Sequence, residues 1–272
     1  MLKLLTISKS QKSDVKNTMK NNKNIFPLVG VLILIAFALI TGCSEAEETG
    51  IWANDRVIDI HAHIGTYEGY DLSIGTLMEN MDRYGIEMAL VSNIDGANVE
   101  GFTKNLSESE TNEATAQIVR RHPNKLKGLL WAKPEEGNPE MLEKFLSDEN
   151  YKDLFIGIKI HPEFNNFEVD LPNAEEYLEL CDKYDIPAVY HSGGEGSNSD
   201  PRKIYEVARR HPDVKIILYH TGFLGPHDRA INTVKEAIET GGADLYVETA
   251  QMEPEAVMKA IEDLGPDRVL FG

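Results

Sequence analysis

From residue 56 onward, short apolar runs alternate with amphipathic stretches along the chain. Apolar runs bounded by turn residues are typical of buried strands, and apolar residues spaced three and four apart are typical of helices that pack on a sheet. The pattern predicts eight strands, at residues 56–63, 87–93, 126–132, 154–161, 186–191, 214–220, 245–249 and 268–271. It predicts seven intervening helices, at residues 73–84, 112–121, 139–147, 174–184, 201–210, 228–239 and 253–264.

Strict alternation of strands and helices predicts parallel strands joined by right-handed crossovers. Eight such units close into a (β/α)₈ TIM barrel. A doubly wound open sheet is the alternative, but it would not bring the ends of strands one, four, five and six to one point. We therefore expect an α/β TIM barrel over residues 54–272, without its eighth helix because the sequence stops directly after strand eight.

An apolar segment precedes this barrel region. Residues 28–40 form an uncharged run of thirteen, shorter than the about twenty residues that a membrane-spanning helix needs. Lysines precede the run and small residues follow it, which is the layout of a secretory signal peptide. The tetrad before and including Cys43, Ile-Thr-Gly-Cys, resembles a lipoprotein cleavage box, which implies cleavage before Cys43 and a lipid on its sulfur.

We accordingly expect a signal peptide at residues 1–42 and a tether at residues 43–53. The protein would be exported to the cell envelope and lipid-anchored at the outer face of a membrane. An uncleaved signal anchor is the alternative.

The chain carries a formal net charge of −18; residues 1–42 contribute +5, so the remainder carries −23. Such acidity argues against nucleic-acid binding, which needs a basic surface, and indicates a self-repelling, soluble surface. Only two cysteines occur, and Cys181 within a predicted helix is expected to be a small buried hydrophobe, so no disulfide framework is predicted. The sequence does not indicate an oligomeric state.

The candidate chemistry lies at the ends of the predicted strands. Five of the eight histidines fall there, together with a lysine; the six residues are His61, His63, Lys159, His161, His191 and His220. His61 and His63 are two apart in one strand, so they face the same side. All C-terminal strand ends of a barrel surround one mouth, and neutral imidazole is a favoured metal ligand. The pattern therefore predicts a metal centre at the mouth.

Five segments carry a family resemblance: residues 58–63 (Ile-Asp-Ile-His-Ala-His), 157–162 (Gly-Ile-Lys-Ile-His-Pro), 190–193 (Tyr-His-Ser-Gly), 219–222 (Tyr-His-Thr-Gly) and 268–272 (Arg-Val-Leu-Phe-Gly). Over residues 54–272 the chain resembles the amidohydrolase superfamily, within it the amidohydrolase-related group of metal-dependent TIM-barrel hydrolases and decarboxylases. The resemblance implies one or two divalent ions, usually zinc, held by His61, His63 and His191. His220 is then either a ligand of a second ion or a general base.

Other strand-end residues have two roles open to them. The resemblance implies for Lys159 either a carboxylated lysine that bridges two ions, or an ammonium that binds a substrate carboxylate or pairs with an acid. His161 either contacts substrate or is a hydrogen-bonded wall residue. Trp131 either lines the pocket or packs in the core. Glu248 is a candidate to orient a ligand histidine through a hydrogen bond.

One departure from the family pattern concerns the end of strand eight. There the family has a metal-binding aspartate just beyond the Leu-Phe-Gly motif, whereas this sequence ends at Gly272. No substitute lies nearby in the sequence, so we expect imidazoles without a carboxylate partner, in a fragment of a working enzyme.

The resemblance implies a metal-dependent hydrolase that uses an activated water on a small amide, ester or lactone. A metal-dependent decarboxylase or hydratase is the second hypothesis, which Lys159 as a carboxylate clamp would favour. A non-catalytic envelope lipoprotein is the third. The substrate does not follow from the sequence.

Overall fold

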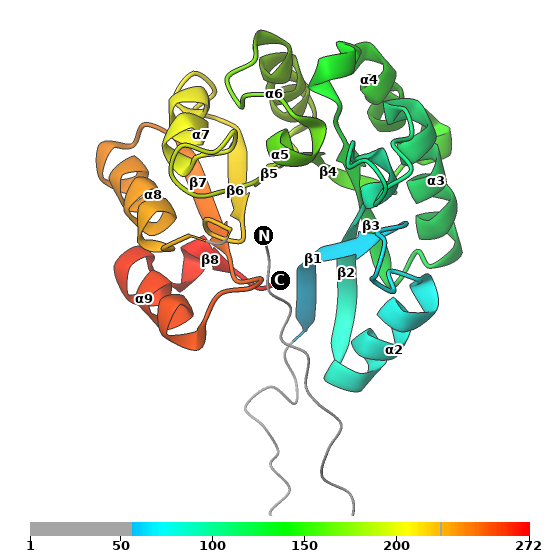
Figure 1. The fold of residues 1–272 in the computed structure, drawn as a ribbon, viewed down its shortest axis with the longest axis horizontal. Helices are drawn as coiled ribbons and strands as arrows, with labels where there is room; N and C mark the ends of the chain where they lie inside the picture. Colours follow the sequence, from blue (N-terminus) through cyan, green and yellow to red (C-terminus); the bar gives the residue numbers. More distant parts are fainter. Residues whose placement is uncertain (1–55, 224) are drawn as a thin grey trace, which may run out of the picture. The chain divides into compact units, whose positions relative to one another are not determined.

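The computed structural model describes residues 56–223 and 225–272, and within them eight parallel strands follow one another in sequence order around a barrel (Figure 1). The strands are β1 (Val57–Ile64), β2 (Ile86–Asn93), β3 (Leu126–Trp131), β4 (Phe155–Ile160), β5 (Ala188–His191), β6 (Lys215–Tyr219), β7 (Asp244–Glu248) and β8 (Val269–Leu270). The Ile60 N–H donates to the Phe271 carbonyl at 3.0 Å and links the segment after β8 back to β1. The predicted TIM barrel is therefore confirmed, with a nearly closed sheet.

The helices lie outside the strands (Figure 1). They are α2 (Ile74–Tyr84), α3 (Glu108–Arg121), α4 (Pro139–Ser147), α5 (Pro162–Asn165), α6 (Pro172–Tyr184), α7 (Pro201–Ala208), α8 (Asp228–Thr240) and α9 (Pro254–Leu264). Short 3₁₀ turns are η1 (Ile94–Gly96), η2 (Pro134–Glu136), η3 (Glu149–Tyr151) and η4 (Pro266–Arg268). All seven predicted helices are present, most within two residues of their expected bounds.

Two helical segments differ from the prediction. Helix α3 begins four residues earlier than expected, because Ser107 and Glu110 form a reciprocal capping box that satisfies N–H groups of its first turn. Helix α5 was not predicted. It follows β4 directly, with Pro162 at its first position and the His161 side chain accepting the Phe164 N–H at its N-terminus.

The apolar core has an inner and an outer part. Leu90, Leu129, Val189 and Ile217, from four different strands, belong to an inner buried cluster, and apolar residues of the other strands pack against it. A larger buried cluster lies between the sheet and the helices. Cys181 on α6 is a free, buried thiol within this outer layer, as expected from its helical context. The outer packing holds the strands in the register that brings their C-terminal ends together.

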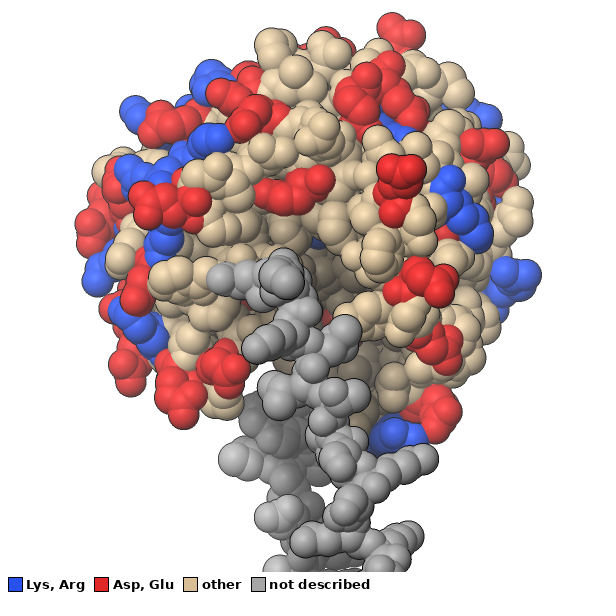
Figure 2. Space-filling model, viewed as in Figure 1, with Lys and Arg blue, Asp and Glu red and all other residues tan. Residues whose placement is uncertain are grey.

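Acidic side chains surround the barrel on the face shown in Figure 2, with basic side chains interspersed among them. None of the helices described for residues 56–223 and 225–272 is both long and apolar enough to cross a membrane. The expected signal peptide, the tether and the lipid-bearing Cys43 lie outside the described residues.

Candidate metal centre

The five strand-end histidines form one cluster at the barrel mouth. The ring of His61 lies 5.1 Å from that of His63 and 4.5 Å from that of His220. His191 continues the cluster, with its ring 5.0 Å from His220 and 4.0 Å from His161. The structure thus brings together histidines from β1, from the end of β5 and from the turns after β4 and β6, as expected for a shared mouth.

His61 and His63 aim their Nε2 atoms at each other at 3.2 Å. The Nδ1–H of His61 donates to Glu248 Oε2 at 2.8 Å, and since a carboxylate only accepts, Nε2 of neutral His61 carries a lone pair. The Nδ1 of His63 lies 2.9 Å from the Ser92 hydroxyl, which can accept its proton and leave Nε2 unprotonated as well. Both Nε2 atoms can therefore donate an electron pair to a metal ion at one point.

This pair has the geometry of two ligands of one cation. Two nitrogens bound at about 2.1 Å to a tetrahedral ion lie about 3.4 Å apart, close to the observed separation. Burial, and next the charge of Lys159, lower the pKa of His61 well below its usual value. The same two causes lower the pKa of His63 to about 3. The rings are therefore neutral near pH 7, the state that binds a divalent metal.

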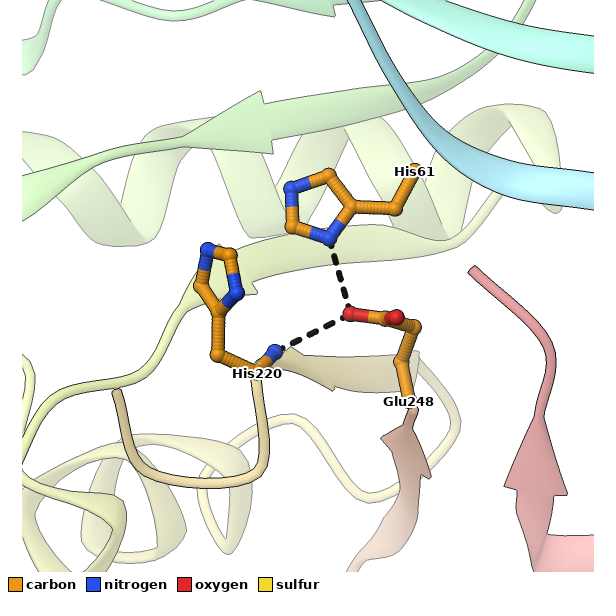
Figure 3. A group of neighbouring side chains, drawn as sticks. All are labelled: His61, His220 and Glu248. Atoms are coloured by element: carbon orange, nitrogen blue, oxygen red, sulfur yellow. Dashed lines mark hydrogen bonds and ion pairs between the residues drawn. The ribbon is translucent and has the colours of Figure 1, made fainter. Parts of the chain in front are cut away.

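Glu248 connects two of the histidines. Its Oε2 accepts the Nδ1–H of His61 and, at 3.0 Å, the backbone N–H of His220 (Figure 3). Its Oε1 accepts the N–H of Ala250. The side chain is fully buried, and this burial raises its pKa to about 7. Our expectation of imidazoles without a carboxylate partner is thus wrong, because β7, which only β8 separates from β1, brings Glu248 to His61.

His220 lies on an unusual turn. Its φ is 64°, and Thr221 and Gly222 follow with φ of 50° and 94°, so three consecutive residues are left-handed. A β-branched residue rarely adopts this conformation. Two hydroxyls hold the turn: Thr221 donates to the Glu248 carbonyl at 2.6 Å, and Ser192 accepts the Gly222 N–H at 2.9 Å.

This turn leaves His220 with an available nitrogen. Its Nδ1 is buried and finds no hydrogen-bond partner among residues 56–223 and 225–272. Burial and the charge of Lys159 lower the pKa of His220 to about 3. His220 therefore presents a neutral imidazole, which can bind a metal ion or accept a proton.

Lys159 lies at the centre of the cluster. It is 1% exposed, and its Nζ is 3.9 Å from the centre of the Tyr219 ring. It forms no ion pair with a carboxylate in the described part of the chain. Burial lowers its pKa well below the usual value for lysine. Such a lysine is suited to carboxylation as a neutral amine, or to pairing with a bound anion as an ammonium.

His161 and Trp131 form a wall beside the cluster. His161 uses Nδ1 to accept the Phe164 N–H, and its ring stacks on Phe164 and His191 at 4.0 Å each. Trp131 is fully buried 5.8 Å from the His161 ring and clusters with Ile94 and Ala97. The sequence left two roles open for each residue. The contacts of His161 fit a hydrogen-bonded wall residue, and those of Trp131 fit core packing.

Two polar residues at the site were missed. Ser92 is the penultimate residue of β2 and lies beside His63, and Glu163 on α5 places Oε2 3.8 Å from His191 Nε2. Their positions near the C-terminal end of a strand, within three residues of it, were a usable signal, since every C-terminal strand end borders the mouth.

Known proteins resemble the chain in sequence and in fold. The family model described as amidohydrolase matches residues 58–272. This chain belongs to the amidohydrolase family. A search of curated proteins finds no match to this chain.

Solved structures share its fold. A Staphylococcus aureus protein assigned to the amidohydrolases has a TM-score of 0.60 and 14% identity, covering 80% of this chain and 87% of its own. A dihydroxybenzoic acid decarboxylase from Polaromonas sp. JS666, with bound manganese, has a TM-score of 0.53 and 17% identity, covering 80% of this chain and 85% of its own. An Acinetobacter baumannii protein assigned as a 2-pyrone-4,6-dicarboxylic acid hydrolase has a TM-score of 0.54 and 12% identity, covering 80% of this chain and 83% of its own. At these identities the likeness establishes the fold.

Proposed function

We propose that this chain is a metal-dependent hydrolase that acts on a small amide, ester or lactone. The observation that carries the proposal is the pair of converging Nε2 atoms of His61 and His63, each with its Nδ1 held by a partner. His191 is the third proposed ligand. A bound divalent ion would polarise a carbonyl group and lower the pKa of water.

Imidazole ligands suit zinc, which we propose as the ion; manganese, present in the Polaromonas decarboxylase, is the alternative.

The chain's own residues would supply proton transfer and substrate binding. His220 is the proposed general base, because its buried Nδ1 has no hydrogen-bond partner in the described chain. Lys159 would bind an anionic group of the substrate or of the developing product. Glu248 would hold His61 and the His220 turn in place from behind.

Decarboxylation is the second candidate. The buried amine of Lys159 forms no ion pair with a carboxylate among the described residues, and a substrate carboxylate bound beside it would favour its ammonium form, which is the arrangement expected of a carboxylate clamp. The dihydroxybenzoic acid decarboxylase among the solved structures also favours this reaction. Both candidates use the same histidine centre and differ in the bond that breaks.

Metal content and product analysis test the proposal. We expect the purified protein to hold one or two divalent ions, and His61→Ala and His63→Ala to lose metal and turnover. His122→Ala is the control, since His122 only ends α3. Water-dependent cleavage in a panel of amides, esters and lactones supports the hydrolase, whereas carbon dioxide release supports the decarboxylase. Metal binding without either reaction would indicate a non-catalytic binder, and a metal-free protein would contradict the metal centre.

We also propose that the protein is exported and lipid-anchored at Cys43. The sequence layout of residues 28–43 supports this location. Cys43→Ser should release the protein from the membrane fraction and remove the lipid mass. Unchanged fractionation and an unchanged N-terminal mass would contradict the anchor.

A further inference from the structure

We infer that Glu163 is a positioning residue of the metal centre, which accepts the Nε2–H of His191 and so leaves the Nδ1 lone pair of that histidine as its metal-binding atom. The inference rests on the proposed role of His191 as a ligand. Glu163 would then orient His191 as Glu248 orients His61. Glu248 faces Nδ1 of His61, whereas Glu163 faces Nε2 of His191.

Glu163 is held in place by the loop after β5. The Ser199 backbone N–H donates to Oε1 at 3.0 Å, and the Ser199 hydroxyl donates to Oε2 at 2.5 Å. Gly193 permits this approach, because a Cβ at that position would lie 3.1 Å from Glu163 Oε1 and 2.4 Å from Ser197 Oγ. The carboxylate is thus fixed by a serine that is itself fully buried.

The contact between Glu163 and His191 involves one specific nitrogen. Oε2 lies 3.8 Å from His191 Nε2, which is longer than a hydrogen bond, and a ring or side-chain movement of less than about 1 Å would bring the two atoms to hydrogen-bond distance. The other nitrogen, Nδ1, is buried and has no hydrogen-bond partner among the residues that the structure describes. A carboxylate next to Nε2 favours the tautomer with its proton there, so the orphaned Nδ1 becomes the electron-pair donor.

A different use of the same residues is a metal site shared by His161, Glu163 and His191, whose potential ligand atoms all lie within 4.8 Å of one another. The ring geometry opposes it. The rings of His161 and His191 stack 4.0 Å apart at 12°, so their in-plane lone pairs lie in nearly parallel planes and cannot meet at one ion. His161 also uses Nδ1 to accept the Phe164 N–H. Positioning of His191 is therefore the better account of Glu163.

Glu163→Gln tests this role with a defined chemical change. The Ser199 N–H requires the amide oxygen of glutamine at the Oε1 position, so the amide NH₂ takes the Oε2 position. That NH₂ faces His191 Nε2 as a donor and favours the opposite tautomer. We expect the variant to shift His191 from the Nε2–H to the Nδ1–H form and to bind zinc about 10- to 100-fold more weakly.

Nitrogen NMR of histidine-labelled, metal-free protein reads the tautomer, with the His191 signals assigned from a His191→Gln variant. Chelator competition reads the zinc affinity. Glu195→Gln is the matched control, because Glu195 is an exposed residue nearby and contacts Arg229. Should Glu163→Gln fail to fold, Ser199→Ala removes only the hydroxyl bond to Oε2 and should weaken zinc binding by a smaller factor in the same direction.

The inference is overturned if wild-type His191 is in the Nδ1–H form, or if Glu163→Gln binds zinc as tightly as Glu195→Gln. Failure of the proposed function gives a different result, in which the wild type binds no metal or turns over no substrate. The tautomer of His191 remains readable in that case, because its measurement needs no metal.

Discussion

Glu108 offers a quantitative test of how burial acts on a charged group in this barrel. Its side chain is 2% exposed at the start of α3, and Oε2 accepts the Lys133 N–H at 2.7 Å and the Tyr177 hydroxyl at 2.8 Å. Oε1 is buried and has no partner in the described chain. Burial is the main cause that raises the pKa of Glu108 to about 7 from its usual 4.5.

The sign of the pH effect follows from this pKa. Between about pH 4.5 and 7 the folded protein retains a proton on Glu108 that the unfolded chain has lost, so this group lowers the free energy of unfolding as pH rises. The full effect is roughly 3 kcal/mol, reached above pH 7 and absent below pH 4.5. Glu108→Gln removes the titration, while its amide oxygen can still accept both bonds made by Oε2.

We therefore expect the free energy of unfolding of Glu108→Gln, measured relative to the wild type, to increase by roughly 3 kcal/mol as the pH rises from 4.5 to 8. Urea unfolding of both proteins across this range, with metal removed by chelation, measures the difference, and contributions of the histidines cancel because both proteins contain them. Glu110→Gln is a control on the same helix: hydrogen bonds from Ser107 lower the pKa of Glu110, so its effect has the opposite sign. A pH-independent difference for Glu108→Gln would refute the reasoning.

Two further predictions concern the supports of the metal centre. Thr221→Val removes the hydroxyl that bonds the backbone carbonyl and N–H of Glu248, and should lower the free energy of unfolding by about 1–3 kcal/mol in urea. Thr221→Ser keeps the hydroxyl, and an equal loss in both variants would contradict a hydrogen-bond origin. Ser92→Ala removes the partner of His63 Nδ1 and should weaken zinc binding about 10-fold or more in chelator competition. Unchanged zinc affinity would show that Ser92 does not orient His63.

Periodicity was sufficient to predict the barrel because strands and crossover helices leave regular apolar patterns in the sequence. The same pattern put His61 and His63 on one side of a strand and placed His191 and His220 at neighbouring strand ends. The start of α3 was misplaced, although its Ser107–Glu110 capping box is a local signal. The short helix α5 was missed because the prediction continued β4 through His161 and ended it at Pro162.

The sequence by itself determined the fold class and the set of imidazoles at the mouth, since strand period and strand end are local properties. Only the tertiary structure decided which ring nitrogen of each histidine is left to bind a metal ion. His61 meets Glu248 across 187 positions of the chain, His63 meets Ser92 across 29, and Glu163 reaches His191 through a helix and a loop. Such pairings depend on barrel closure, strand register and side-chain rotamers, which arise from the packing of the whole barrel and leave no mark in a local pattern.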